Sequence, residues 1–75
     1  MNIGMLWFDN DPKTDITVKI DRAADYYRHK YEQTPNLCFV HPSMLKTSPV
    51  KAGSIEVRSS RSVLPNHFWL GLHIM

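Results

Sequence analysis

The sequence has one cysteine, Cys38, only three glycines and no long apolar run. A lone cysteine cannot form a disulfide within the chain, and no Cys/His spacing resembles that of a structural zinc site. No stretch approaches the roughly 18 apolar residues that a membrane helix needs, and we expect no signal peptide. These absences predict a cytoplasmic protein with no membrane segment, no metal site and no cofactor.

Seventy-five residues suffice for one compact domain, which we expect to span residues 1–75. A chain of this length buries only about 60% of the surface that its unfolded form exposes. Small domains therefore often depend on a disulfide, a metal ion or a partner chain. Because the sequence offers neither of the first two, a homo-oligomer is the simplest supplement.

Hydrophobic periodicity divides the chain into one helix and four strands. Apolar residues recur at helical spacing over residues 13–33, where Asp11 and Pro12 provide a candidate helix start. Alternating or continuous apolar runs predict strands at residues 2–9, 37–41, 54–60 and 67–74, with an exposed loop over 46–53. We expect an α/β (α+β-like) fold, in which one long helix covers one face of a four-stranded mixed sheet of order β-α-β-β-β.

The pattern of each run also predicts which strands are neighbours. The first strand is apolar at nearly every position, which favours a place near the middle of the sheet. The helix that joins it to strand 37–41 predicts that these two strands are parallel neighbours. We expect strands 54–60 and 67–74 to form an antiparallel hairpin.

The aromatic residues are the most informative group for function. Successive side chains of a strand point to opposite faces of the sheet, and both faces of these strands are apolar. One helix covers only one face, so the other needs a second cover. We expect Trp7, Phe39 and Trp69, with His67 nearby, to form an interface or stacking surface. The leading hypothesis is a small non-enzymatic interaction or regulatory protein that self-associates, as a dimer, through this face; a different protein partner is also possible.

Charge suggests an alternative function. The net charge is only +2, but residues 40–75 hold four basic residues and one acid, Glu56. Exposed aromatic residues on a sheet can stack with unpaired bases, and basic residues bind phosphate. This arrangement is compatible with a single-stranded nucleic-acid-binding protein, although an ordinary solvated surface explains the same charges. The candidate anion-binding residues are Arg58, Arg61, Lys46 and Lys51.

A second alternative is a metal-assisted hydrolase. Asp9, Asp11 and His41 follow the first two predicted strands, and parallel strands end at the same edge of a sheet, where α/β proteins often place ligands. Two carboxylates and an imidazole are suitable metal ligands or acid–base groups. The same residues are also typical of turns and helix caps. We therefore rank an enzyme below an interaction protein.

Overall fold

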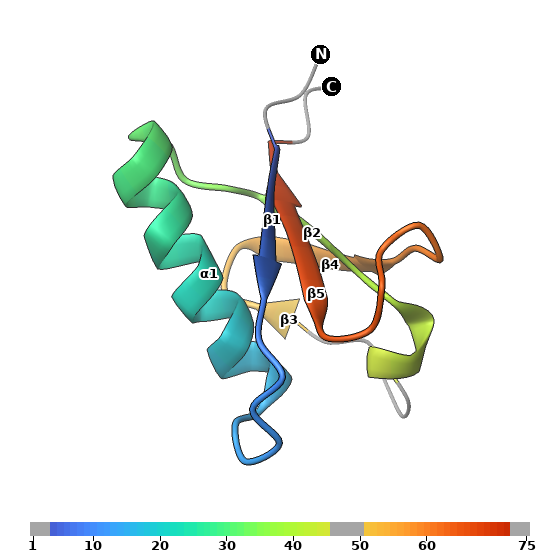
Figure 1. Cartoon of the computed structure of the whole chain (residues 1–75). Helices are drawn as coiled ribbons and strands as arrows, with labels where there is room; N and C mark the ends of the chain where they lie inside the picture. The colour runs from blue at the N-terminus through green and yellow to red at the C-terminus, as the bar shows by residue number, and fades with distance from the viewer. Residues whose placement is uncertain (1–3, 46–50, 73–75) are drawn as a thin grey trace.

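The computed structural model describes residues 4–45 and 51–72. In these ranges the chain forms one long helix against one side of a mixed sheet (Figure 1). The predicted α+β fold with order β-α-β-β-β is confirmed, and one additional two-residue strand extends the sheet. The elements are β1 (Gly4–Phe8), α1 (Ile16–Tyr31), β2 (Leu37–Val40), the 3-10 helix η1 (Pro42–Met44), β3 (Lys51–Ala52), β4 (Ile55–Ser59) and β5 (His67–Gly71).

The additional strand, β3, occupies the end of the segment predicted as a loop. Its Ala52 is buried and pairs with Ile55 of β4 across a tight turn. Gly53 lies in that turn with φ +60°, a backbone conformation that favours glycine. Residues 46–50 of the predicted loop, and the outer ends of the strands predicted at 2–9 and 67–74, lie outside the described residues.

The strand order, β1-β5-β2-β4-β3, corrects two predicted pairings. β5 lies between β1 and β2 and is antiparallel to both, so β1 and β2 run in the same direction without being neighbours. β4 and β5 form no hairpin, because the connection over 60–66 carries the chain across β2. β4 instead lies parallel to β2. β5 is therefore an interior strand, and β2 is the central strand of the five.

β1 is an edge strand, which corrects its predicted place near the middle of the sheet. Within the described residues it pairs with β5 alone. Its Met5 is buried toward α1, whereas Leu6 and Phe8 on the other face are exposed. The apolar run therefore reflects one face covered by the helix and one face left open, rather than burial on both sides.

α1 begins at Ile16, three residues later than predicted, and Asp11 is not its N-cap. The Asp11 carboxylate closes a separate polar turn, in which it accepts hydrogen bonds from the Lys13 N–H (2.9 Å) and the Thr14 hydroxyl (2.6 Å). Asp15 is the N-cap residue instead. No helix in the described ranges is long and apolar enough to cross a membrane.

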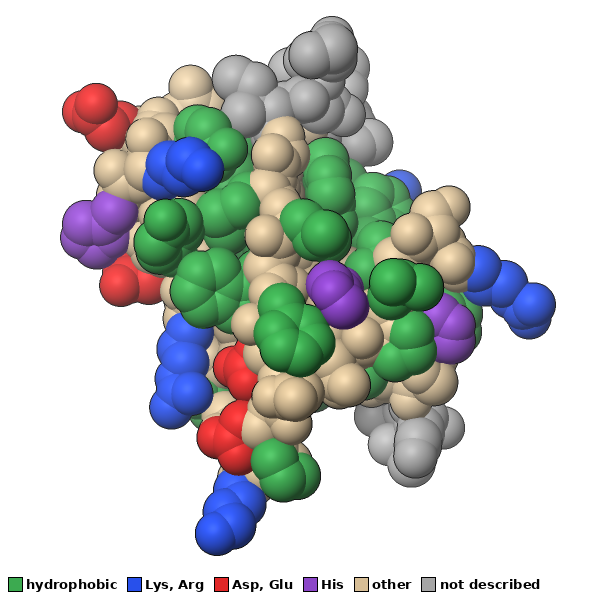
Figure 2. Space-filling model, in the orientation of Figure 1, with side chains coloured by type: hydrophobic (Ala, Val, Ile, Leu, Met, Phe, Trp, Pro, Cys, Tyr) green, Lys and Arg blue, Asp and Glu red, His purple; other side chains and the backbone are tan. Residues whose placement is uncertain are grey.

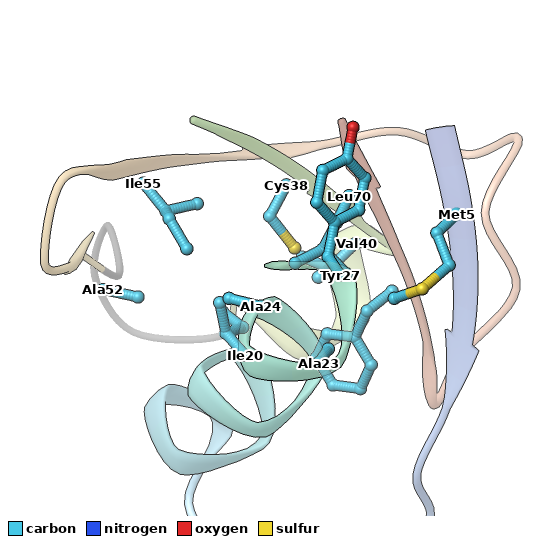
Figure 3. Packing of buried hydrophobic residues seen from close by; sticks show 11 residues of the cluster. Met5, Ile20, Ala23, Ala24, Tyr27, Cys38, Val40, Ala52, Ile55 and Leu70 are labelled. Atoms are coloured by element: carbon cyan, nitrogen blue, oxygen red, sulfur yellow. The ribbon is translucent and has the colours of Figure 1, made fainter. Parts of the chain in front are cut away.

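α1 packs against the sheet through its predicted apolar stripe (Figure 3). Two consecutive alanines, Ala23 and Ala24, bring the helix backbone close to the strands, while Ile20 and Tyr27 fill the space on either side. The sheet side of this core is apolar on every strand. It consists of Met5, Cys38, Val40, Ala52, Ile55, Phe68 and Leu70.

Candidate functional site

The face of the sheet opposite α1 carries an apolar and aromatic surface, which we call the open face. Strand register places its members on one side. Leu6 lies opposite Trp69, Phe8 opposite His67, and Phe39 opposite Trp69. Their neighbours in sequence, Met5, Phe68, Leu70, Cys38 and Val40, point to the helix side and form the core. The open face consists of Leu6, Phe8, Phe39, His67 and Trp69.

Side-chain contacts connect these residues across three strands. The Phe39 and Trp69 rings lie 5.7 Å apart between centroids, and the Phe8 and His67 rings lie 5.0 Å apart. Both separations are within the range of favourable aromatic pairs. The carbonyl of Pro65 accepts a hydrogen bond from Nδ1 of His67 at 2.9 Å, which fixes the orientation of that ring.

Exposure on the open face increases toward the β1 edge. Phe39, His67 and Trp69 are half-buried, whereas Leu6 is 62% exposed and Phe8 is 56% exposed. In Figure 2, which has the same orientation as Figure 1, apolar side chains gather over β1. The largest exposed apolar side chains of the sheet therefore lie on its edge strand.

Trp69 is held in place by a glycine of the edge strand. A Cβ atom built on Gly4 would lie 2.1 Å from Cζ2 and 2.5 Å from Nε1 of the Trp69 indole. The indole therefore rests directly on the β1 backbone at Gly4. A glycine inside a strand often marks such a close approach, so this residue was a usable sequence signal.

Trp7 does not belong to the open face, which corrects its predicted grouping with Phe39 and Trp69. It lies opposite Phe68 in the register and points to the helix side, where its ring is 5.2 Å from that of Tyr26. Its Nε1 is buried without a hydrogen-bond acceptor in the part of the chain that the structure describes. Leu6 and Phe8 occupy the surface position that was predicted for Trp7.

Two of the predicted anion-binding residues, Arg58 and Arg61, have side chains that the structure describes, on β4 and in the connection that follows it. Arg58 lies beside Phe39 in the register, and its guanidinium forms an ion pair with Glu56 on the same strand. Arg61 is exposed in the connection before β5. Lys51 begins β3, and Lys46 lies outside the described residues. Arg58 is thus the one described basic residue of this set that adjoins the aromatic pair.

Asp9, Asp11 and His41 each make local hydrogen bonds at the ends of β1 and β2. Asp9 accepts from the Asp11 N–H at 3.0 Å, and Nδ1 of His41 accepts from the Ser43 N–H at 3.1 Å. β5 lies between the two strands, which places their axes about 10 Å apart. Within residues 4–45 and 51–72, no group of three or more His, Cys, Asp or Glu side chains could hold a metal ion.

Lys19 connects this loop to the helix. It is the buried charged residue among those described, and its Nζ donates to the Asp9 carbonyl at 3.4 Å. The β1–α1 loop is thereby attached to the first turns of α1.

Comparison with protein-family models, with curated proteins and with solved structures found no match.

Proposed function

We propose that this protein is a small non-enzymatic interaction module that self-associates by burying the β1 side of its open face. The observation that carries the proposal is the exposure of Leu6 and Phe8 on an edge strand, next to the Phe39–Trp69 pair. Large apolar side chains grouped in this way on a sheet are typical of an interaction surface. The core is small, and a second copy would add the apolar burial that a chain of this length lacks.

The exposed residues support a weak rather than a permanent dimer. Phe8 exposes roughly 100 Å² of apolar surface at its observed exposure, and we assume about the same for Leu6. Burying both residues in two copies removes about 400 Å² from water, which corresponds to about 10 kcal/mol of gross stabilisation. Association costs about 4–15 kcal/mol in lost freedom. The balance predicts reversible association that depends on concentration.

Sedimentation velocity over protein concentrations from about 1 µM to about 1 mM tests the proposal, because this range spans the affinities of weak complexes. We expect the wild-type mass to rise from that of one chain to that of two chains. Phe8→Lys places a charge on the open face at an exposed position, so the fold should persist while the dissociation constant rises at least about tenfold.

Val18→Lys is the matched control. Val18 is an exposed apolar residue of similar accessibility, 41%, but lies on α1 away from the open face. The Val18→Lys variant should dimerise like the wild type, and circular dichroism should show that the Phe8→Lys and Val18→Lys variants are both folded. A wild-type protein that keeps the mass of one chain throughout the concentration range would refute self-association.

The proposed location is the cytoplasm. Cys38, the one cysteine, is fully buried, and burial raises the pKa of its thiol to about 12. Such a thiol is compatible with a reducing compartment and needs no disulfide partner. The location stays a proposal, which fluorescence microscopy of a tagged chain in its own cell would test.

Single-stranded nucleic-acid binding is a second candidate, supported by the position of Arg58 beside the Phe39–Trp69 pair. Aromatic rings on a sheet with a neighbouring guanidinium can stack with bases and bind phosphate. A Trp7→Phe variant leaves Trp69 as the sole tryptophan. Quenching of its fluorescence by oligonucleotides, weakening steeply with salt, would support this function. Unchanged fluorescence at low salt would exclude stacking on Trp69.

A further inference from the structure

We infer that two copies of this chain associate edge to edge, with β1 antiparallel to β1 of the second copy, so that the two sheets become continuous. The inference rests on the self-association proposed above and specifies its geometry.

The outward backbone groups of β1 follow from one hydrogen bond. The Asp9 N–H donates to the Asn66 carbonyl at 3.0 Å, so Asp9 and Asn66 form a hydrogen-bonded pair of the β1–β5 ladder. Such pairs alternate along an antiparallel ladder. The backbone N–H and C=O groups of Met5 and Trp7 therefore face β5. The backbone N–H and C=O groups of Gly4, Leu6 and Phe8 point away from β5.

The two edges of the sheet differ in their protection against pairing. Within the described residues, the β3 edge strand has two residues, Lys51 and Ala52. β1 has five residues, Gly-Met-Leu-Trp-Phe, without a charge or a proline. Charges, proline and short length are the usual means by which proteins prevent edge pairing. β1 lacks all three, which makes it the edge open to a further strand.

A twofold axis at Leu6 gives a self-complementary register. Leu6 then lies opposite Leu6 of the second copy, and each Phe8 lies opposite a Gly4. Because Gly4, Leu6 and Phe8 all point outward, this register satisfies their N–H and C=O groups with about six hydrogen bonds. If the second copy were shifted by one residue along β1, its strand would lie opposite Met5 and Trp7, whose backbone N–H and C=O groups already face β5 and cannot pair with it.

The side chains favour the same register. Gly4 has no side chain, and the Trp69 indole rests on it. Because the Trp69 indole reaches from β5 over Gly4, the exposed Phe8 ring of the second copy, directly opposite Gly4, would lie next to the outer edge of that indole on the open face. An aromatic ring next to a glycine-supported indole is a compatible pair, whereas a residue larger than glycine at position 4 would exclude it.

A second copy fits the available area better than a larger partner. The β1 edge is about 17 Å long, and each copy adds Leu6 and Phe8. The apolar surface that Leu6 and Phe8 of one copy would bury falls short of the about 800 Å² that each partner buries in a standard interface. Backbone pairing between two uncharged identical strands suits a weak, reversible contact of this size.

Residue-resolved amide exchange of the wild-type protein, at concentrations below and above the dimer transition, tests the geometry. The amides of Met5 and Trp7 should be protected at both concentrations because they face β5. Those of Leu6 and Phe8 should exchange quickly in the monomer and at least about tenfold more slowly in the dimer. An isotope-filtered NOE experiment on a mixed-label sample should show Phe8 of one copy near Trp69 of the other.

The outcomes separate this inference from the proposed function. If the protein dimerises but Leu6 and Phe8 amides exchange as in the monomer, the edge pairing is wrong and another use of the open face remains. If the exchange slows but the Phe8–Trp69 contact is absent, the register is wrong. A chain that stays monomeric overturns both. Leu6→Pro removes one outward N–H; it should weaken association more than Leu6→Ala does.

Discussion

Gly4→Ala tests the contact that holds the open face together. In an unobstructed strand, replacing glycine by alanine at an ordinary φ stabilises a protein by about 0.4–1 kcal/mol, because the unfolded chain loses freedom. At Gly4 the new Cβ would lie 2.1 Å from the Trp69 indole, far inside contact distance. The ring or the β1 backbone must shift, and overpacking of this kind costs about 1–3 kcal/mol. We therefore expect net destabilisation.

The expected size can be measured by thermal unfolding. In a domain of this length, about 1 kcal/mol corresponds to about 4–8 °C in Tm, so Gly4→Ala should lower Tm by roughly 5–15 °C. The assay follows circular dichroism and tryptophan fluorescence in a Trp7→Phe background, in which Trp69 alone reports. A red shift of the native emission would show that the indole has moved into water.

A double-mutant cycle with Trp69→Phe isolates the contact. The smaller ring should accept the Cβ, so the two changes together should cost less than their sum by about 1 kcal/mol. Gly53→Ala is the matched control, because its φ is +60° and no atom lies within 4 Å of the added Cβ. It should destabilise through backbone strain alone and show no coupling to residue 69. A stabilised Gly4→Ala variant would refute the reasoning.

Two further predictions concern titratable groups. The hydrogen bond from the Thr14 hydroxyl, followed by that from the Lys13 N–H, lowers the pKa of Asp11 below its ordinary value. Because the pKa of Asp11 is lower in the folded than in the unfolded protein, this group stabilises the fold above about pH 4, and the stabilisation is lost as the pH falls through the folded pKa. Thr14→Val removes the hydroxyl donor and should raise the pKa of Asp11 measured by NMR titration. An unchanged pKa would contradict the assignment. Burial raises the pKa of Cys38 to about 12, so Ellman's reagent at about pH 8 should modify the folded protein slowly and the unfolded protein at once. Rapid modification of the folded chain would show that Cys38 is accessible.

The sequence predicted the elements well because their signals are local. The stripe containing Ile20, Ala23 and Tyr27 has helical spacing, and the same residues are buried against the sheet. The alternation of Phe68 and Leu70 with Trp69 assigned both faces of β5 correctly. Asp25 and Arg28 are three residues apart in sequence, a spacing that brings side chains together on a helix surface, and they form an ion pair with 2.7 Å between Asp25 Oδ1 and Arg28 Nη2.

Strand order was not predictable in the same way, because pairing depends on residues far apart in sequence. Consecutive strands usually lie side by side, which favoured a β4–β5 hairpin and a β1–β2 pair. No local signal shows that the 60–66 connection crosses β2. The misplacement of Trp7 has a related cause. A face of β1 can be assigned only relative to its partner, and pairing with β5 puts Trp7 opposite Phe68, on the helix side.

The position of β5 between β1 and β2 has a consequence for how the protein is made. Among the described strands β5 is the last in chain order, yet it joins β1 to the rest of the sheet. Until residues 67–71 emerge from the ribosome, the nascent chain has no strand with which β1 can form its native ladder. The apolar residues of β1 would therefore stay in water during translation, when chaperones or a neighbouring nascent copy could bind them.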